Sequence, residues 1–77
     1  MVDIRNIKWN GKYAVADLYE DGSKEIAYTI EVDCEAEKVV KNSNGEEMNQ
    51  YISQAIWALC KRYRAGERPK NMRIMWY

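Results

Sequence analysis

The chain has 77 residues, of which 47% are hydrophobic and 31% are charged. This length and this balance predict one globular domain and exclude a disordered chain, because two cores would each be too small to fold and disordered chains carry fewer apolar residues. Twelve basic and twelve acidic side chains give a net charge of zero, which excludes a strong overall attraction to nucleic acid or to an acidic membrane.

Turn signals divide the first half of the chain into three predicted strands. An Asn-Gly pair at positions 10–11 is typical of a tight hairpin turn, and it joins a strand at about residues 4–9 to a second strand at 12–20. An Asp-Gly-Ser turn at 21–23 leads to a third strand at 24–33, in which apolar and polar residues alternate. We therefore expect three consecutive antiparallel strands.

The hydrophobic period changes after a weaker fourth strand, which we place at about residues 38–42. Ser43 with Glu46, or Asn44 with Glu47, would form a capping box, in which the first side chain accepts a hydrogen bond from an early backbone N–H and the acid reaches back. Either pair predicts the start of a helix at this point.

Apolar residues then recur at helical spacing along one stripe. The stripe consists of Met48, Ile52, Ala55, Ile56, Leu59 and Tyr63. Gly66 suits the position just after a helix, and Pro69 prevents the helix from resuming. The pattern predicts one long helix over about residues 46–65.

The last residues, 72–77, alternate again and predict a C-terminal strand or an extended tail. One helix that covers one face of a sheet gives a two-layer domain. We therefore expect an α+β fold in which an antiparallel sheet of about four strands packs on one long helix, with the C-terminal strand or tail beside them.

Charge is unevenly distributed along the chain. Residues 1–50 hold eleven acids and six bases, whereas residues 51–77 hold six bases and one acid. The six cations of the second half are Lys61, Arg62, Arg64, Arg68, Lys70 and Arg73. They could bind phosphates, complement the helix C-terminus and keep a loop hydrated, or dock on the acidic half within the fold or between subunits.

Trp57 stands about half a turn away from the apolar stripe, with Ser53, Lys61 and Arg64 as its helical neighbours. Three interpretations stay open for a tryptophan on such a polar face. The C-terminal tail covers it, with Ile74 or Trp76, or it anchors a protein interface, or it stacks on a nucleobase.

The sheet face away from the helix is a second candidate surface. If Tyr13, Val15 and Tyr19 lie on that face, they would make it adhesive. A chain of this size also folds only marginally alone. We therefore expect a homodimer or a protein partner.

The chemistry of the remaining residues indicates neither a metal site nor catalysis. Histidine is absent, so Cys34 and Cys60 lack a partner for a zinc site or a base that would activate a thiol. Their spacing leaves a disulfide open, but the absence of an export signal favours two reduced thiols in the cytoplasm. The alternating acids between residues 31 and 37 suit a solvated strand face better than a cation site. No apolar window approaches the ~18 residues of a membrane span.

Two runs carry a resemblance: VKNSNGEE at 40–47 and GERPKNMRIMWY at 66–77, the latter with its Gly66-x-x-Pro69 spacing and final Met-Trp-Tyr. With the hairpin start and the single amphipathic helix, the chain resembles short uncharacterised bacterial proteins, of mobile-element or commensal type, that end in Met-Trp-Tyr. The resemblance implies a bacterial cytoplasmic setting and no particular activity, cofactor or site residue.

Together these features predict a small non-enzymatic protein-interaction or self-association module that needs no cofactor, no metal and no small-molecule ligand. Its candidate surface is Trp57, Tyr63 and the basic end of the helix. The alternative is a nucleic-acid-binding accessory protein that uses the six cations of the second half.

Overall fold

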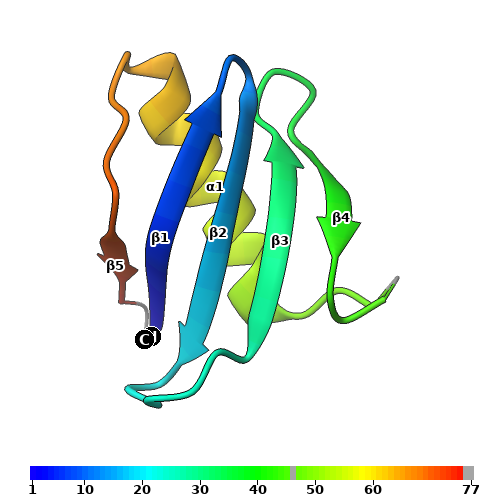
Figure 1. The fold of residues 1–77 in the computed structure, drawn as a ribbon, viewed down its shortest axis with the longest axis vertical. Coiled ribbons are helices and arrows are strands. Elements are labelled where there is room, and N and C mark those ends of the chain that lie inside the picture. Colours follow the sequence, from blue (N-terminus) through cyan, green and yellow to red (C-terminus); the bar gives the residue numbers. More distant parts are fainter. Residues whose placement is uncertain (46, 76–77) are drawn as a thin grey trace.

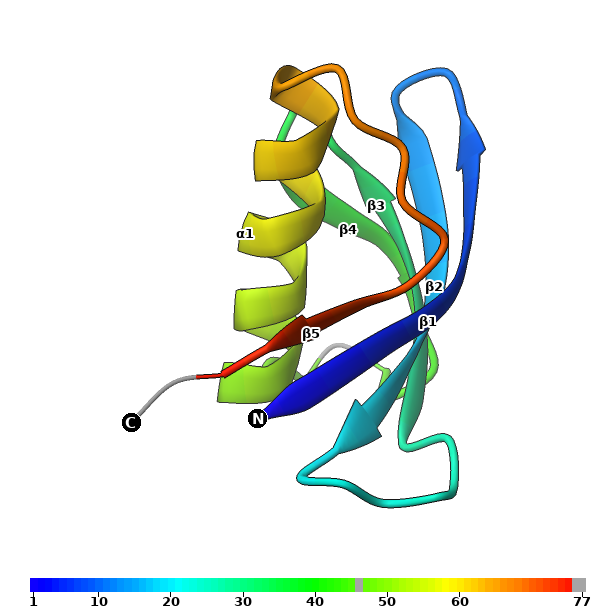
Figure 2. The same ribbon diagram turned by 90° about the vertical axis from the view of Figure 1, so that its left-hand side faces the viewer.

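The computed structural model describes residues 1–45 and 47–75 and contains one five-stranded antiparallel sheet and one helix. The elements are β1 (Val2–Asn10), β2 (Tyr13–Glu20), β3 (Tyr28–Asp33), β4 (Lys38–Asn42), α1 (Gln50–Arg64) and β5 (Met72–Ile74). The helix lies across one face of the sheet (Figure 1), and the two layers are clear when the molecule is turned (Figure 2). The predicted two-layer α+β class is therefore confirmed.

The sequence predicts a sheet of about four strands with a C-terminal strand or tail beside them, and the structure has five strands because the C-terminal segment joins the sheet. The strand order is β4-β3-β2-β1-β5. β5 pairs antiparallel with β1, with Val2 opposite Ile74 and Ile4 opposite Met72. The helix thus carries the chain from the β4 edge to the opposite edge. The predicted strand at 72–77 is confirmed for its first three residues, and Trp76 and Tyr77 lie outside the described residues.

The first hairpin forms where the Asn-Gly pair predicts it, and its first strand is longer than expected. β1 begins at Val2, and its register with β2 shifts between Arg5 and Lys8. Asn6 stands at this bulge with a positive φ of 55°. The extra residue lets Ile7 return to the buried face of the sheet, where it is 5% exposed.

The third strand is four residues shorter than predicted. Residues 24–27 belong to the connection after β2, because the turn at 21–23 is extended by a hydrogen bond from the Glu25 backbone N–H to the Ser23 hydroxyl at 3.2 Å. Ile26 is 52% exposed there, so the alternation that included it gave a wrong strand start.

The helix starts later than predicted and is not long. It has 15 residues, and the side chain of Asn49 caps it by accepting from the Ile52 backbone N–H at 3.0 Å. Ser43 instead accepts from the Thr29 backbone N–H at 2.9 Å, so the predicted capping boxes are wrong for Ser43 and for Glu47, which precedes the helix. Glu46 lies outside the described residues.

The helix ends as the sequence predicts, around Gly66. Gly66 has a positive φ of 79°, and the Gly66 and Glu67 backbone N–H groups donate to the Tyr63 and Arg62 carbonyls at 3.1 and 2.9 Å. This is a Schellman ending, which glycine permits at low conformational cost. It turns the chain back toward the β1 edge.

The core lies between α1 and the inner face of the sheet. Its fully buried larger side chains are Ile4, Leu18, Ile30, Ile52, Leu59, Val2, Val32, Cys34 and Cys60. Ala14 and Ala16 of β2 and Ala55 and Ala58 of α1 are buried with them. Small residues in both layers let the helix lie close to the sheet. Met48, which the sequence places in the apolar stripe, is 53% exposed ahead of the helix.

The outer sheet face is less apolar than its sequence suggests. Tyr13, Val15 and Tyr19 are only half-buried on β2, alternating with the buried Ala14, Ala16 and Leu18. Charged side chains cover the rings: Arg5 lies 5.7 Å from the Tyr19 ring centroid and Lys12 lies 5.5 Å from that of Tyr13. Cations over aromatic rings give this face a polar surface.

Candidate interaction site

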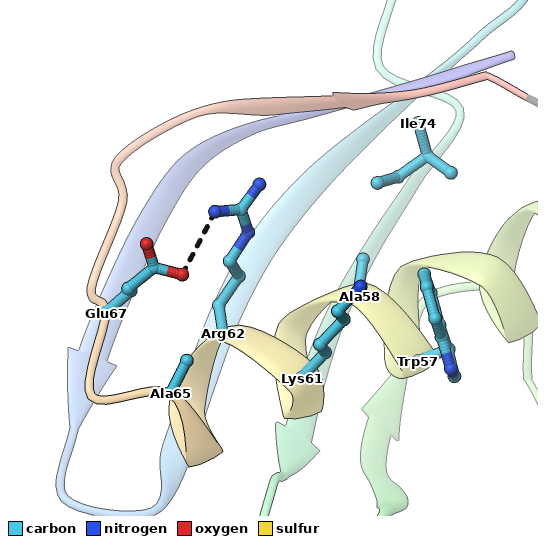
Figure 3. Close-up of a pocket in the computed structure, with 7 residues that line it drawn as sticks. All are labelled: Trp57, Ala58, Lys61, Arg62, Ala65, Glu67 and Ile74. Carbon is cyan, nitrogen blue, oxygen red and sulfur yellow. Dashed lines mark hydrogen bonds and ion pairs between the residues drawn. The ribbon is translucent and has the colours of Figure 1, made fainter.

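Trp57 is the most exposed aromatic side chain described on the helix, at 55%. It borders a pocket of about 210 Å³ between α1 and β5. The pocket is lined by Trp57, Ala58, Lys61, Arg62, Ala65, Glu67 and Ile74. Figure 3 shows Ile74 facing the helix from across the pocket. We call this feature the α1–β5 groove.

The position of Trp57 follows from helical periodicity. Leu59 is fully buried, and Trp57 precedes it by two residues, about 200° around the helix axis. The sequence prediction that Trp57 lies on the outer face is confirmed. Ile74 lines the same groove without burying the ring, so the described part of the tail does not make Trp57 a core residue.

Lys61 joins Trp57 on the outer surface of the helix. Its ammonium nitrogen lies 4.8 Å from the Trp57 ring centroid, a cation–π contact. The uncharged residues Ser53 and Gln54, of which Ser53 is exposed and Gln54 half-buried, border a second hollow beside the same ring. Residues 50–64 contain no Asp or Glu at all. The surface around Trp57 is therefore apolar and basic, with no acid from its own helix.

Arg62 and Arg64 have acidic partners within the chain. An Arg62 guanidinium nitrogen lies 3.0 Å from a Glu67 carboxylate oxygen, across one end of the groove (Figure 3). Arg64 pairs with Glu37, which lies in the connection between β3 and β4. Both pairs lie on the surface, where solvent weakens them.

Arg68 is exposed, and its guanidinium contacts two aromatic rings of the fold. It lies 4.6 Å from the Tyr63 centroid and 5.2 Å from that of Trp9. It also donates to the Tyr63 and Glu67 carbonyls at 3.2 and 2.8 Å. Trp9 in turn donates its indole N–H to the Pro69 carbonyl at 2.9 Å. These contacts fasten the α1–β5 connection to the end of β1.

Arg73 fastens β5 to β1. It donates to both carboxylate oxygens of Asp3, at 2.5 and 3.2 Å, while Arg5 lies 3.5 Å from one of them. The Asp3 side chain is almost buried, and the hydrogen bond from Arg73 holds the pKa of its carboxyl below the usual value. Lys70 is exposed, and its carbonyl accepts from the Ile7 backbone N–H at 2.9 Å.

The six predicted cations therefore do not form one patch. Lys61 and Arg62 lie together at the groove, whereas Arg68 packs on Trp9 and Arg73 lies on β5. Two pairs, Arg64 with Glu37 and Arg73 with Asp3, join the basic half to the acidic half, as one of the sequence interpretations anticipates. Tyr63, the other predicted surface residue, is half-buried under Arg68.

Three of the alternating acids on β3 and after it contact a cation of the chain: Glu31 lies near Lys41, Asp33 near Lys12 and Glu37 near Arg64. Asp33 is 6% exposed, and its carboxylate accepts from the Glu35 and Ala36 backbone N–H groups at 3.1 and 3.0 Å. Lys12 lies 3.6 Å from the same carboxylate. Backbone hydrogen bonds lower the pKa of Asp33. Asp33 is thus a buried turn residue and not part of a solvated face. Among residues 1–45 and 47–75, no cluster of His, Cys, Asp or Glu could hold a metal ion.

Comparisons with family models, curated proteins and solved structures find no match for this chain. Within the described residues, no helix is long and apolar enough to cross a membrane. The geometry of the α1–β5 groove is therefore the basis for a functional proposal.

Sequence reasoning found Trp57, Lys61 and Arg62, and one of its three interpretations placed Ile74 of the tail over Trp57. The structure places Ile74 in the same groove without covering the ring, and this position depends on the pairing of β5 with β1. No local pattern indicates that pairing. Ala58 could have been found, because it is the small residue that follows Trp57 and opens the space beside the ring.

Proposed function

We propose that this chain is a small protein-interaction module that binds its partner through the α1–β5 groove. One observation supports this proposal above all: Trp57 is 55% exposed on a helix whose inner side is fully buried. A tryptophan held in water exposes a large apolar area that burial against a partner would stabilise. Trp and Arg are also the residues most enriched at the centres of protein interfaces.

The role that we propose is non-enzymatic. The two thiols are the strongest nucleophiles of the sequence, and burial raises the pKa of both, to about 12 for Cys34. A thiol in this state is a poor nucleophile. Two buried free thiols also fit a reducing compartment, and the bacterial cytoplasm remains part of the proposal.

Nucleic-acid binding is supported less well. It would need the cations to face outward together and free of carboxylates. Arg62, Arg64 and Arg73 each contact a carboxylate of the chain, and the Arg68 guanidinium makes cation–π contacts with Tyr63 and Trp9. Lys61 and Lys70 line different pockets, Lys61 beside Trp57 and Lys70 beside Asn6, so they do not form a shared basic surface. We therefore retain nucleic acid as an outcome of the test and not as a second proposal.

Site-specific photo-crosslinking in cells that express this chain tests the proposal. A photoreactive phenylalanine analogue replaces Trp57 in one variant and Met48 in a matched control, since Met48 is equally exposed, at 53%, on another part of the surface. We expect discrete crosslinked protein bands from position 57 and not from position 48. Lys61→Glu should weaken these bands.

The size and chemistry of the crosslinked product identify the partner. A band at twice the mass of the chain would indicate self-association, and a nuclease-sensitive band would support the nucleic-acid alternative instead. Equal or absent crosslinking at the two positions would contradict an interaction surface centred on Trp57.

A further inference from the structure

The two edges of the sheet are protected to different degrees. An open edge presents unpaired backbone N–H and C=O groups, and proteins block it with lysines and bulges. β4 has both devices: Lys38 and Lys41 are exposed, and the pairing with β3 shifts register so that Val40 is an extra residue. This edge is unsuited to a further strand.

The short strand β5, Met72–Ile74, contains neither a lysine nor a bulge, and exposed Lys70 lies two residues before it. Its inner-side residues, Met72 and Ile74, are apolar and half-buried, and the following Met75 is 59% exposed. Its one cation, Arg73, is held by Asp3 on the neighbouring strand. The backbone from Lys70 to Ile74 follows β1, so its other side runs along the sheet edge (Figure 1).

The α1–β5 groove lies directly over this edge. Side chains of a strand alternate between the two faces of a sheet, so a strand added beyond β5 would direct every second side chain toward α1. Those side chains would meet Trp57, Ala58 and Ile74, which line the groove together. Backbone pairing at the edge and side-chain burial in the groove would then stabilise the same bound segment.

The positive charge of the groove favours a bound segment that carries negative charge. Lys61 and Arg62 line the groove with one acid, Glu67, and the helix contributes no acid. A second copy that paired through its own β5 would complement it poorly, because the Asp3 carboxylate beside that β5 is already paired with Arg73 and α1 contains no acid. A segment with carboxylates beside an apolar side chain fits both the charge and the shape.

We propose that the α1–β5 groove takes an extended acidic segment of a partner protein, which pairs with β5 as a sixth strand. This inference rests on the proposed function, since it names the kind of partner for the same groove. One apolar side chain of the segment packs between Trp57 and Ile74, and a carboxylate two positions along lies near Lys61, since Arg62 is already paired with Glu67.

Selection of random peptides displayed on phage against the full chain tests this inference without a known partner. We expect the selected peptides to share an alternating pattern of acidic and β-branched or aromatic residues. Their binding should weaken at least about tenfold in Trp57→Ala and in Lys61→Glu, and it should be unchanged in the matched control Met48→Ala. Trp57 and Met48 are both exposed, so these variants should fold.

Backbone methylation of a selected peptide tests strand pairing itself. N-methyl groups placed at successive positions remove one backbone donor at a time. In an added strand only alternate N–H groups face β5, so binding should fall by about tenfold at every second position and little between.

Each failure has a separate meaning. If selected peptides need Trp57 but are not acidic, or show no alternation on methylation, the sixth-strand inference is overturned and the interaction surface stands. If no peptide is enriched, the inference is also overturned. If enriched peptides bind Trp57→Ala as well as the natural chain, both the inference and the proposed function fail.

Discussion

At the scale of single residues, the two cysteines are the least accessible reactive groups of the chain. Cys34 follows β3, Cys60 lies on α1, and they are 0% and 1% exposed. The two thiols lie close enough to influence each other's pKa, and both are free. Burial raises the pKa of Cys34 to about 12 and raises that of Cys60.

Both thiols should therefore react slowly with a disulfide reagent while the chain is folded. At about pH 8 almost no thiolate is present in the core, so we expect a rate at least about 100-fold below that of the unfolded chain. The matched control is Ser53→Cys, which places a thiol at an exposed helix position. The control thiol should react at once, and release of the coloured thiolate follows both rates.

The same pKa shifts set the behaviour of the fold at high pH. A raised pKa means that the folded state holds the thiol proton more tightly than the unfolded state, whose thiols titrate near pH 8.5. Stability from these groups is therefore complete below about pH 8.5 and declines as pH rises toward the folded value. Native thiols that react as quickly as the Ser53→Cys control would contradict this account of the core.

At the scale of elements, the start of the helix depends on one side chain. Asn49 accepts from the Ile52 backbone N–H at 3.0 Å and donates to the Tyr28 hydroxyl at 2.8 Å, so it fixes the helix to β3. Asn49→Ala should lower the free energy of unfolding by about 1 kcal/mol, the usual cost of a lost N-cap. Urea unfolding followed by circular dichroism measures this change.

The control for the cap comes from the capping box that the sequence suggests. Glu47 is exposed ahead of the helix, so Glu47→Gln should change stability by less than about 0.5 kcal/mol. A larger effect for Glu47→Gln than for Asn49→Ala would show that the helix begins earlier than Gln50.

The elements also show what a sequence pattern can and cannot predict. The hairpin at Asn10-Gly11, the β4 segment and the Schellman ending at Gly66 depend on local backbone chemistry, and each lies where it was predicted. The predicted first residues of the third strand and of the helix were wrong, because several nearby residues gave equally good local signals for a start. Only tertiary contacts select among them, such as that of Ser43 with Thr29.

The candidate site also has one part that local sequence patterns predict and another that depends on tertiary contacts. Trp57 and Lys61 could be predicted because they lie four residues apart on one helix face. Their opposite wall, Ile74, depends on β5 pairing with a strand 70 residues earlier in the chain, near Asp3. Two of the cations also have carboxylate partners far away in the sequence, Arg64 with Glu37 and Arg73 with Asp3. Composition alone therefore overstates the basic surface.

At the scale of the whole molecule, the acidic first half and the basic second half largely neutralise each other. Pairs between Arg64 and Glu37 and between Arg73 and Asp3 cross between the halves, and Arg62 pairs with Glu67 within the second half. A polyanion would have to displace these carboxylates to bind. The fold thus reduces the attraction for phosphates that the charge of residues 51–77 suggests.

Freeing these cations should create an affinity that the natural chain lacks. We expect no binding of labelled single- or double-stranded oligonucleotides at about 0.15 M salt, measured by fluorescence anisotropy. The double variant Glu37→Gln with Glu67→Gln leaves Arg64 and Arg62 unpaired, and it should bind more tightly at low salt, with a steeper loss of affinity as salt rises.

The matched control is a second double variant, Glu25→Gln with Glu35→Gln, which removes two exposed carboxylates outside these pairs and has the same net charge as the first variant. If this control binds as tightly as the first variant, net charge and not release of the paired arginines controls binding. Tight salt-sensitive binding by the natural chain would instead show that the internal pairs do not shield its cations.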